Sequence, residues 1–553
     1  MESEKREVET TSVYTDQEVK REHDSSASSK DDDRIEVSSL ESQIPSHKLK
    51  RSLKARHLAM ISLGGVIGQG LFLSAGGNLN RAGPAGALIA YAIIGFIVFW
   101  VTFSLGEMAT YIPVSGSFTV FCRRFVDKSF GAVIGYNYWA CWAVIVASEL
   151  TALPLVMSFW TTKVPNAAWS AIYLVIIFTL NMFGARSYGE AEYWFSLIKI
   201  IAVLVFIIVG CVTSGGLIGN TTPHIVYGFK YWKDPGAFSN GALGVVNAFV
   251  LASFSMQGTE IVGITAGECE NPVKQVPRAI RNVFWRIIIF YLGSVFVMGM
   301  LIRWDDERNL SSSSDVTVSP FTIVFEEAGL QAVAHIMNAV ILITVLSCAN
   351  SGLYVGSRMM CALANEGIAH HKLAYISKRG VPVYSICVTA AVSFVTFATS
   401  FIPGKGLFVV LTDLSGIAGF TTWGGIAFAH YRFRSAMKKQ GRSVEELPIK
   451  APFHPFGDIF GMIACVVISL LAGYSYFVPA DAVGLIGNYA GIILCIIGYI
   501  CTKLYTKSKM VPLDEMDLDT GRADIDMLTE ANENDITGVW YVRIWKRLLV
   551  IFT

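Results

Sequence analysis

Twelve long apolar stretches follow one another along the chain, and this succession restricts its fold more than any other feature. A helix needs about 20 predominantly apolar residues to cross the hydrocarbon core of a bilayer, which is about 30 Å thick. Only 16% of the 553 residues are charged, whereas soluble domains carry about 25%. The sequence therefore predicts an all-α polytopic membrane protein and excludes a nucleic-acid binder or an ordinary soluble enzyme. The predicted spans are 58–79, 84–110, 131–160, 167–184, 191–214, 242–267, 286–302, 330–357, 381–402, 408–430, 458–479 and 482–503.

The ends of the chain differ in composition from the apolar region between them. Residues 1–50 are rich in Ser, Asp, Glu and Lys and bury too little apolar surface to fold alone, so we expect a disordered tail. We expect a membrane domain over 51–503 and a C-terminal tail over 504–553 with an amphipathic end at 538–552. The N-terminal tail carries lysines that could accept ubiquitin from a ligase, namely Lys5, Lys20, Lys30, Lys48 and Lys50.

The distribution of Lys and Arg predicts the orientation in the membrane. With the N-terminus inside, the inner loops hold 18 basic residues, among them Arg286, and the outer loops hold 7. Because inner loops carry the excess of Lys and Arg, both termini are predicted to be cytoplasmic. Two glycosylation-type sequons, at Asn220 and Asn309, then fall in outer loops.

Few charged residues lie within the predicted spans, and each is a functional candidate. A charge at the bilayer centre costs about 2.5–3.5 kcal/mol on insertion scales. The candidates are Glu107, Glu149, Lys199, Glu260 and Asp413. Lys199 lies about eight residues into its span, about 12 Å deep. It is either a titrating ammonium beside the first span or one member of a buried ion pair with a glutamate.

Two spans contain sequences that disfavour a continuous helix. The first reads SLGGVIGQGLF over 62–72, and the sixth reads FSMQGTEIVGITAG over 254–267. Small residues also permit close helix packing, which is the alternative interpretation. However, the two spans hold corresponding positions in two five-helix halves, as the interrupted helices of inverted-repeat transporters do. Exposed N–H groups at a half-helix start bind a carboxylate, and exposed C=O groups bind an ammonium, so such a site suits a free amino acid.

Motifs for catalysis or metal binding are absent from the sequence. It contains no HExxH, GxSxG or GxxxxGK[ST], and its ten cysteines are scattered without CxxC spacing. His335, His430 and the pair His370–His371 are isolated or in loops, so structural or solvated roles are expected for them. We therefore predict no catalytic residues, no metal and no cofactor.

Several strings resemble those of a known family. These are GGVIGQGLF, AGPAGALIAY, SLGEMATYIPVSGSFTVF, GEAEYWFSLIK and SFSMQGTEIVGITAGECENP. They resemble amino acid permeases of the amino acid–polyamine–organocation superfamily, from about residue 50 to about residue 500. Within that superfamily, GEAEYWFSLIK and GITAGE are similar to strings of fungal basic amino acid permeases and of the bacterial lysine-specific permease.

The resemblance implies a twelve-helix fold with a 5+5 inverted-repeat, LeuT-like core and unwound helices 1 and 6. It also implies amino acid uptake across the plasma membrane, driven by the proton gradient without a cofactor. By position, Ile67, Gln69 and Gly70 would hold the substrate carboxylate, and Phe254, Ser255, Gln257 and Gly258 the amino group. Glu149 and Glu260 would line the cavity, and Lys199 would couple transport to protons.

The preferred substrate is expected to be a cationic amino acid, lysine or arginine. Glu149, Glu260 and Asp413 can supply the anionic partner that a cationic side chain needs in a dry cavity. Gln69 stands where relatives have threonine, which places fine specificity at that position. The alternatives are a broad-range or neutral amino acid permease, a passive facilitator or exchanger, and a nutrient sensor with little transport. Sensor relatives carry N-terminal extensions much longer than the 50 residues here, so transport is the expected activity.

Overall fold

The chain is a bundle of helices. The computed structural model describes residues 55–522 except 66, 115, 221–223, 267–270, 307–318, 401–403 and 478–479. Within these residues the only β-type pairing is a single bridge between Phe477 and Ala480. The predicted N-terminal tail, Asn309 and the segment 538–552 lie outside the described residues.

All twelve predicted apolar stretches correspond to helical segments. Within the described part of the chain, eight helices are long and apolar enough to cross a membrane, three more are apolar but shorter, and the first segment is broken. The first span comprises α2 (Ala55–Met60), η1 (Ile61–Gly65), α3 (Gln69–Phe72) and the beginning of α4 (Ser74–Tyr111), which is kinked at Gly83 and continues as the second span. The next three spans are α6 (Lys128–Met157), α7 (Asn166–Asn181) and α8 (Ala185–Ser214).

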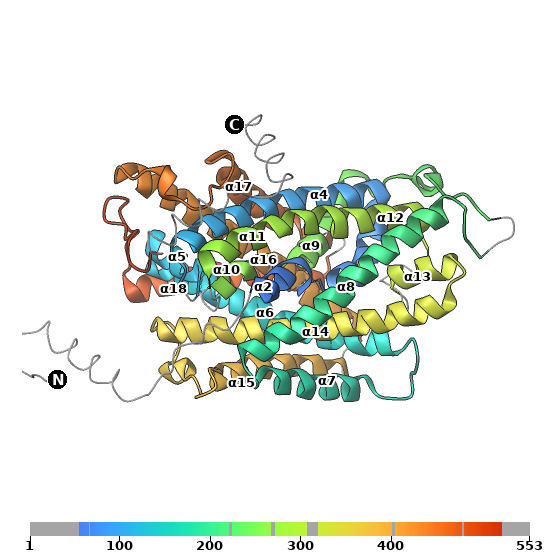
Figure 1. Cartoon of the computed structure of the whole chain (residues 1–553), viewed down its shortest axis with the longest axis horizontal. Helices are drawn as coiled ribbons and strands as arrows, with labels where there is room; N and C mark the ends of the chain where they lie inside the picture. Colours follow the sequence, from blue (N-terminus) through green and yellow to red (C-terminus); the bar gives the residue numbers. More distant parts are fainter. Residues whose placement is uncertain are drawn as a thin grey trace, which may run out of the picture. The chain divides into compact units, whose positions relative to one another are not determined.

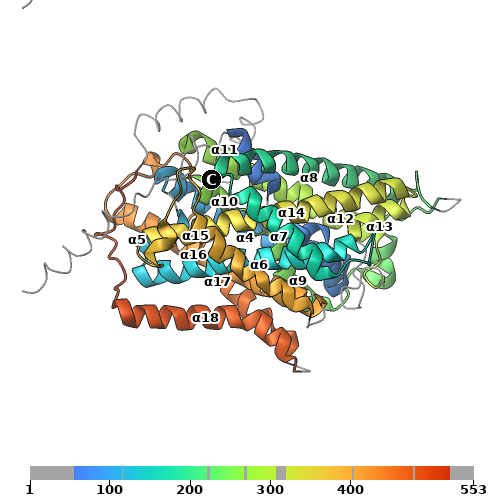
Figure 2. The ribbon, with the colours of Figure 1, turned by 90° about the horizontal axis from the view of Figure 1, so that it is seen from below.

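The next five spans repeat this pattern. They comprise α9 (Gly241–Met256) with α10 (Ile261–Thr265); α11 (Pro272–Trp285), η4 (Arg286–Leu292) and α12 (Gly293–Leu301); α14 (Gln331–Asn365); α15 (Val383–Val392) with η7 (Ser393–Ser400); and α16 (Gly404–Lys439). The last two spans are α17 (Phe456–Leu471) and α18 (Ala482–Thr506). Figure 2 shows α18 along one edge of the bundle.

Corresponding helices of the two halves pack against each other. The first span contacts the sixth through α3 and α9, the second contacts the seventh through α4 and α12, and the third contacts the eighth through α6 and α14. The fourth contacts the ninth through α7 and α15. The long helices run side by side in Figure 1. This pairing is the arrangement that two inverted five-helix repeats produce.

The loops gather at two faces of the bundle. On one, which we call the α5 face, Arg123 of α5 (Phe118–Phe125) bonds Glu366, and Tyr111 bonds Glu446 of η8 (Val444–Glu446). On the other, the α13 face, Asn220 bonds the Glu326 carbonyl in α13 (Pro320–Glu327). The remaining short helices are η2 (Trp232–Gly236), η6 (His371–Ala374) and η9 (Tyr474–Tyr476).

Residues 507–522, which the sequence assigned to the C-terminal tail, pack along the α5 face. The Val511 N–H donates to the Val126 carbonyl at 2.9 Å, and Gln440 donates to the Leu513 and Met516 carbonyls. Arg442 pairs with Asp519 and holds the pKa of that carboxyl below its usual range. This segment therefore ties α5 to the end of α16.

The structure corrects the sequence expectations at the seventh span. The helix begins at Pro272 rather than near 286. Arg286, which we counted among the inner-loop charges, is fully buried inside the bundle. The short helices α5 and α13 were not expected, because each is shorter than nine residues and neither is long enough to give a clear periodic signal.

Candidate functional site

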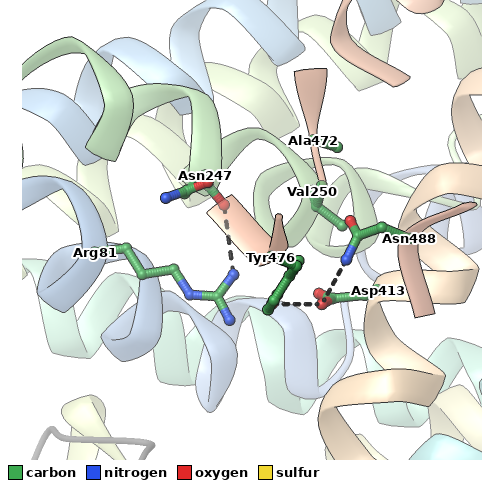
Figure 3. A pocket seen from close by; sticks show the side chains of 7 residues that line it. All are labelled: Arg81, Asn247, Val250, Asp413, Ala472, Tyr476 and Asn488. Atoms are coloured by element: carbon green, nitrogen blue, oxygen red, sulfur yellow. Dashed lines mark hydrogen bonds between the residues drawn. The ribbon is translucent and has the colours of Figure 1, made fainter. Parts of the chain in front are cut away.

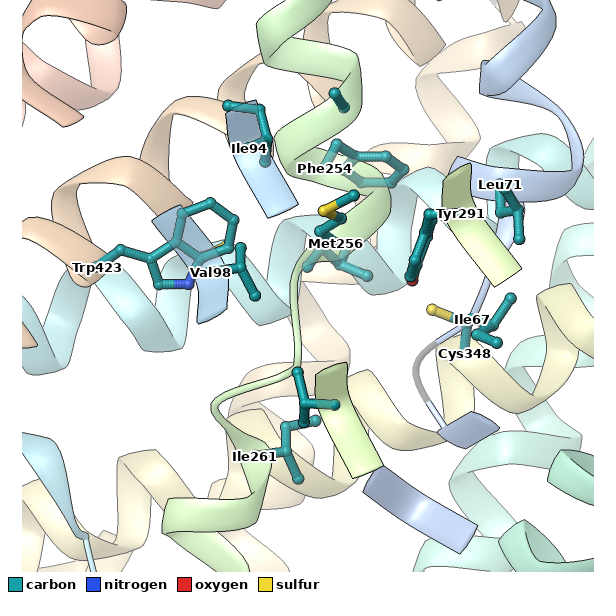
Figure 4. Close-up of a cluster of buried hydrophobic side chains, with 14 of the residues drawn as sticks. Ile67, Leu71, Ile94, Val98, Phe254, Met256, Ile261, Tyr291, Cys348 and Trp423 are labelled. Atoms are coloured by element: carbon teal, nitrogen blue, oxygen red, sulfur yellow. The ribbon is translucent and has the colours of Figure 1, made fainter. Parts of the chain in front are cut away.

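The first and sixth spans are both broken near their middle. Helical structure stops at Gly65 and resumes at Gln69 in the first span. In the sixth, it stops at Met256 and resumes at Ile261, and Gly258 between them has a φ of 84°. Figure 4 shows that the chain is unwound between Met256 and Ile261. Only glycine adopts that backbone conformation without strain, so Gly258 permits the break.

Glycines bring the broken segments very close to their neighbours. A methyl group on Gly68 would lie 2.6 Å from Cys348 Sγ and 2.7 Å from Glu149 Oε1. A methyl group on Gly70 would lie 2.5 Å from the Ser255 Cα. All three distances are too short for a real side chain, so the cluster of glycines permits close approach of the helices as well as unwinding.

A small cavity lies where the two breaks meet. It is lined by Gly68, Gly70, Trp142, Ile145, Glu149, Phe254, Ser255, Gln257 and Cys348. Its open space fits about one water molecule. Five of the predicted binding residues therefore share one cavity: Gly70, Glu149, Phe254, Ser255 and Gln257. The structure thus brings together residues from the first, third and sixth spans.

Glu149 is the acidic side chain that faces this cavity. It lies on α6 with 1% of its surface exposed, against the backbone N–H of Gln69 and the thiol of Cys348. Among the described residues, its Oε2 atom has no hydrogen-bond partner. A buried carboxylate oxygen without a partner is costly, so this atom is available to a cationic ligand group or a proton.

Glu260 has a different environment from Glu149. Its carboxylate accepts hydrogen bonds from the Gly258 N–H at 3.1 Å and the Thr259 hydroxyl at 3.3 Å. The Tyr138 hydroxyl and the Trp423 indole also donate to it, at 3.0 and 3.2 Å. Four protein donors hold this carboxylate across the break in the sixth span, and Glu260 is not among the residues lining the cavity.

Gln69 and Ile67 are buried, but neither lines the cavity. The Gln69 amide donates to the Ser148 hydroxyl on α6 at 2.8 Å, which directs this side chain toward the third span. Ile67 is buried in the hydrophobic cluster of Figure 4. Gln257 lines the cavity, and its amide donates to the Ser415 carbonyl on α16.

Lys199 caps the carboxyl end of the first half-helix. Its ammonium donates to the Gly64 and Gly65 carbonyls, each at 3.2 Å, and to the Ser347 hydroxyl at 2.8 Å. That hydroxyl donates in turn to Glu192, at 2.8 and 2.9 Å to its two oxygens. A cation at the carboxyl end of a helix is favourable because the terminal carbonyls carry partial negative charge.

Glu192 and Arg286 are buried charges that the sequence reading did not select. Glu192 stands at the predicted edge of the fifth span, seven residues before Lys199, and seven residues bring a side chain back to the same helix face. Arg286 donates to the Ser62 carbonyl at 3.3 Å and to the Tyr291 hydroxyl, which donates to the Ser255 carbonyl at 2.7 Å. This chain of bonds links the broken segments of the first and sixth spans.

A second cavity lies farther along α9. It is lined by Arg81, Asn247, Val250, Asp413, Ala472, Tyr476 and Asn488, as Figure 3 shows. Tyr476 and Asn488 each donate to Asp413 at 3.4 Å. Val250 in this cavity and Phe254 in the central one are one helical turn apart on α9, about 6 Å along its axis. Both cavities therefore lie along α9.

Two broken helices in corresponding repeats, meeting at buried polar groups, define a secondary transporter of the inverted-repeat class. Residues 57–514 match the family described as amino acid permease. The chain belongs to this amino acid permease family, whose members are transporters rather than enzymes.

Characterised permeases from bacteria and yeast are similar over most of the chain. The lysine-specific permease LysP of Escherichia coli (strain K12) is 43% identical over 472 residues, which cover 85% of this chain and 96% of that protein. A lysine-specific permease of Saccharomyces cerevisiae is 41% identical over 491 residues, covering 87% of this chain and 80% of that protein. The basic amino-acid permease of S. cerevisiae is 39% identical over 494 residues, covering 87% and 86%.

Proposed function

We propose that this chain is a plasma-membrane uptake permease for cationic amino acids, lysine or arginine, driven by the proton gradient. The proposal includes the predicted orientation, with the α5 face in the cytoplasm. The observation that carries it is the Glu149 carboxylate, which faces the cavity between the broken helices with one unpartnered oxygen among the described residues. A lysine or arginine substrate supplies two cationic groups in one molecule, and this oxygen can accept a hydrogen bond from either.

The backbone of the first and sixth spans supports recognition of the amino acid head group. The N–H groups at the start of α3, near Gln69 and Gly70, suit the substrate carboxylate. The carbonyls released between Met256 and Ile261 suit the α-amino group, beside Phe254, Ser255, Gln257 and Gly258. In this account Ile67 and Glu260 shape the two breaks without meeting the substrate.

Substrate entry requires the broken segments to separate. The central cavity has room for about one water molecule, which is far less than an amino acid needs. The cavity lined by Arg81 and Asp413 lies along the same helix, α9, as the central cavity, so it supports an entry route past Phe254. Movement of the half-helices would then open the central cavity to one face at a time.

Lys199 is the proposed coupling residue. Its ammonium occupies the carbonyl end of the first half-helix, so the presence or absence of its proton changes the attraction that holds this half-helix to α8 and α14. Protonation can therefore bias the equilibrium between conformations, as a ligand with different affinities for two states does.

Competition binding on the purified chain tests the substrate class. We expect unlabelled arginine and ornithine to displace radiolabelled lysine, and leucine and glutamate to leave it bound. Equal displacement by leucine would favour the broad-range alternative. Lysine binding without uptake in proteoliposomes would favour a sensor.

A further inference from the structure

A second group of buried polar residues lies at the α5 face, away from the substrate cavity. His430 and Asp458 have 0% and 2% of their surface exposed, and His454 in the preceding loop has a side chain 22% exposed. His430 Nδ1 lies 2.8 and 3.0 Å from the two Asp458 oxygens. His454 Nδ1 lies 2.7 Å from Asp458 Oδ2. Two imidazoles thus present the same ring nitrogen to one carboxylate.

We infer that His430, His454 and Asp458 form a binding site for a divalent transition-metal ion of the zinc type. One ligand atom from each of the three lies within 4.8 Å of the others. Two imidazole nitrogens and one carboxylate oxygen are a ligand set that zinc accepts, with a fourth position left for water. The partial exposure of His454 provides access from the α5 face.

The surroundings of His430 support this assignment. Its other ring nitrogen, Nε2, lies 3.1 Å from Glu107 Oε1. Histidines that bind metals usually turn their second nitrogen to a carboxylate, which fixes the ring orientation. Glu107 is itself held by the Ala451 N–H at 2.6 Å and by Arg434 Nε at 2.9 Å. The ring is therefore fixed on both sides before an ion arrives.

Neighbouring side chains hold both carboxylates of the cluster in place. The Ser104 hydroxyl donates to Asp458 at 2.8 Å, and Arg434 contacts Glu107. The three ligands come from α16, α17 and the loop between these helices. Glu107, which contacts His430, belongs to a third helix, α4. An ion bound here would join three helices at the α5 face, so we expect it to raise thermal stability.

Zinc binding to the purified full-length chain tests the inference. The protein should carry an affinity tag without histidines, be stripped with a chelator, and be dialysed against Zn²⁺ before elemental analysis. We expect one Zn²⁺ per chain in excess of a His454→Asn variant, and an upward shift of the unfolding temperature with Zn²⁺ but not with Mg²⁺. The His454→Asn variant keeps a side-chain donor beside Asp458, and its affinity should fall at least tenfold.

A matched variant separates this site from incidental histidines. His371 is exposed at the start of the short helix η6, next to His370, so His371→Asn should keep the wild-type stoichiometry. Should His454→Asn aggregate, Asp458→Asn provides the same test. Equal Zn²⁺ content in the wild type and the His454→Asn variant would overturn the inference, as would a loss confined to His371→Asn.

Discussion

Gly70 in the first span and Ser255 in the sixth approach so closely that a methyl group on Gly70 would lie 2.5 Å from the Ser255 Cα. This contact joins the two broken helices at the cavity. The partner atom belongs to the backbone, so a larger residue displaces a helix rather than a flexible side chain. Transport by this chain therefore depends on the contact and the separation of these two broken segments.

Gly70→Ala should therefore abolish uptake. Overpacking of this kind costs about 1–3 kcal/mol and occasionally more, and here it also widens the gap between the two half-helices. Lysine uptake, normalised to surface expression, should fall below about a tenth of the wild-type rate. Gly498→Ala in α18 is the control, because the added methyl group meets its nearest neighbour at an ordinary 3.7 Å. Uptake retained in Gly70→Ala would show that the close contact is dispensable.

Glu149→Gln should weaken recognition of cationic substrates. A hydrogen bond to a charged group contributes about 1.5–3 kcal/mol, so kcat/KM for lysine should fall about 10–150-fold. Competition by neutral amino acids should increase relative to lysine. Uptake kinetics over a panel of substrates provide the measurement.

Glu260→Gln makes the same chemical change in the carboxylate that bridges the other break. Because four protein donors already satisfy Glu260, we expect lower thermal stability with an unchanged substrate ranking. A changed ranking in Glu260→Gln with none in Glu149→Gln would exchange the roles assigned to these two residues.

Gln69→Thr should leave the substrate ranking unchanged. The sequence placed fine specificity at this position, but the Gln69 amide bonds Ser148 and does not line the cavity. Loss of that bond should cost about 0.5–1.5 kcal/mol, which a thermal unfolding assay in detergent can detect. A shift from lysine toward neutral substrates would show that this side chain reaches the substrate during transport.

Lys199→Ala should remove the response of uptake to external pH. The substitution also leaves Glu192 without its bridged cation, and breaking such a buried pair costs about 3–5 kcal/mol. Comparison with Lys199→Ala/Glu192→Gln separates the two effects, since the double variant should recover stability without recovering pH dependence. Lys378→Ala, an exposed loop substitution, controls for general effects. Full pH dependence in the double variant would exclude Lys199 from coupling.

The fold was predictable because its strongest signals are local in sequence. Apolar length fixes the spans, and glycine clusters mark both breaks, so the twelve helices and their two interruptions required no structure. The α5 and α13 helices are too short to carry such a signal. Arg286 was mistaken for a loop charge because it stands at the boundary of an apolar run, where charge alone does not distinguish a loop from a buried helix end.

The candidate site was predictable only in part, because its contacts are distant in sequence. Glu149 and Gly70, which the sequence predicts to bind the substrate, line one cavity, and their role in binding stays a prediction. The bonds from Lys199 through Ser347 to Glu192 join α8 to α14, and composition gives no sign of that pairing. Similarly, nothing in the sequence shows that Glu260 meets donors from α6 and α16, while Glu149 keeps one oxygen that has no partner among the described residues.

Uptake of radiolabelled lysine by permease-deficient cells that express this chain tests the central claim most directly. The assay should include a protonophore arm and an excess of each class of unlabelled amino acid. The proposed function predicts that uptake collapses when the proton gradient is removed and that only cationic amino acids compete. Uptake that persists without the gradient would contradict proton coupling, and equal competition by leucine or glutamate would contradict the cationic substrate.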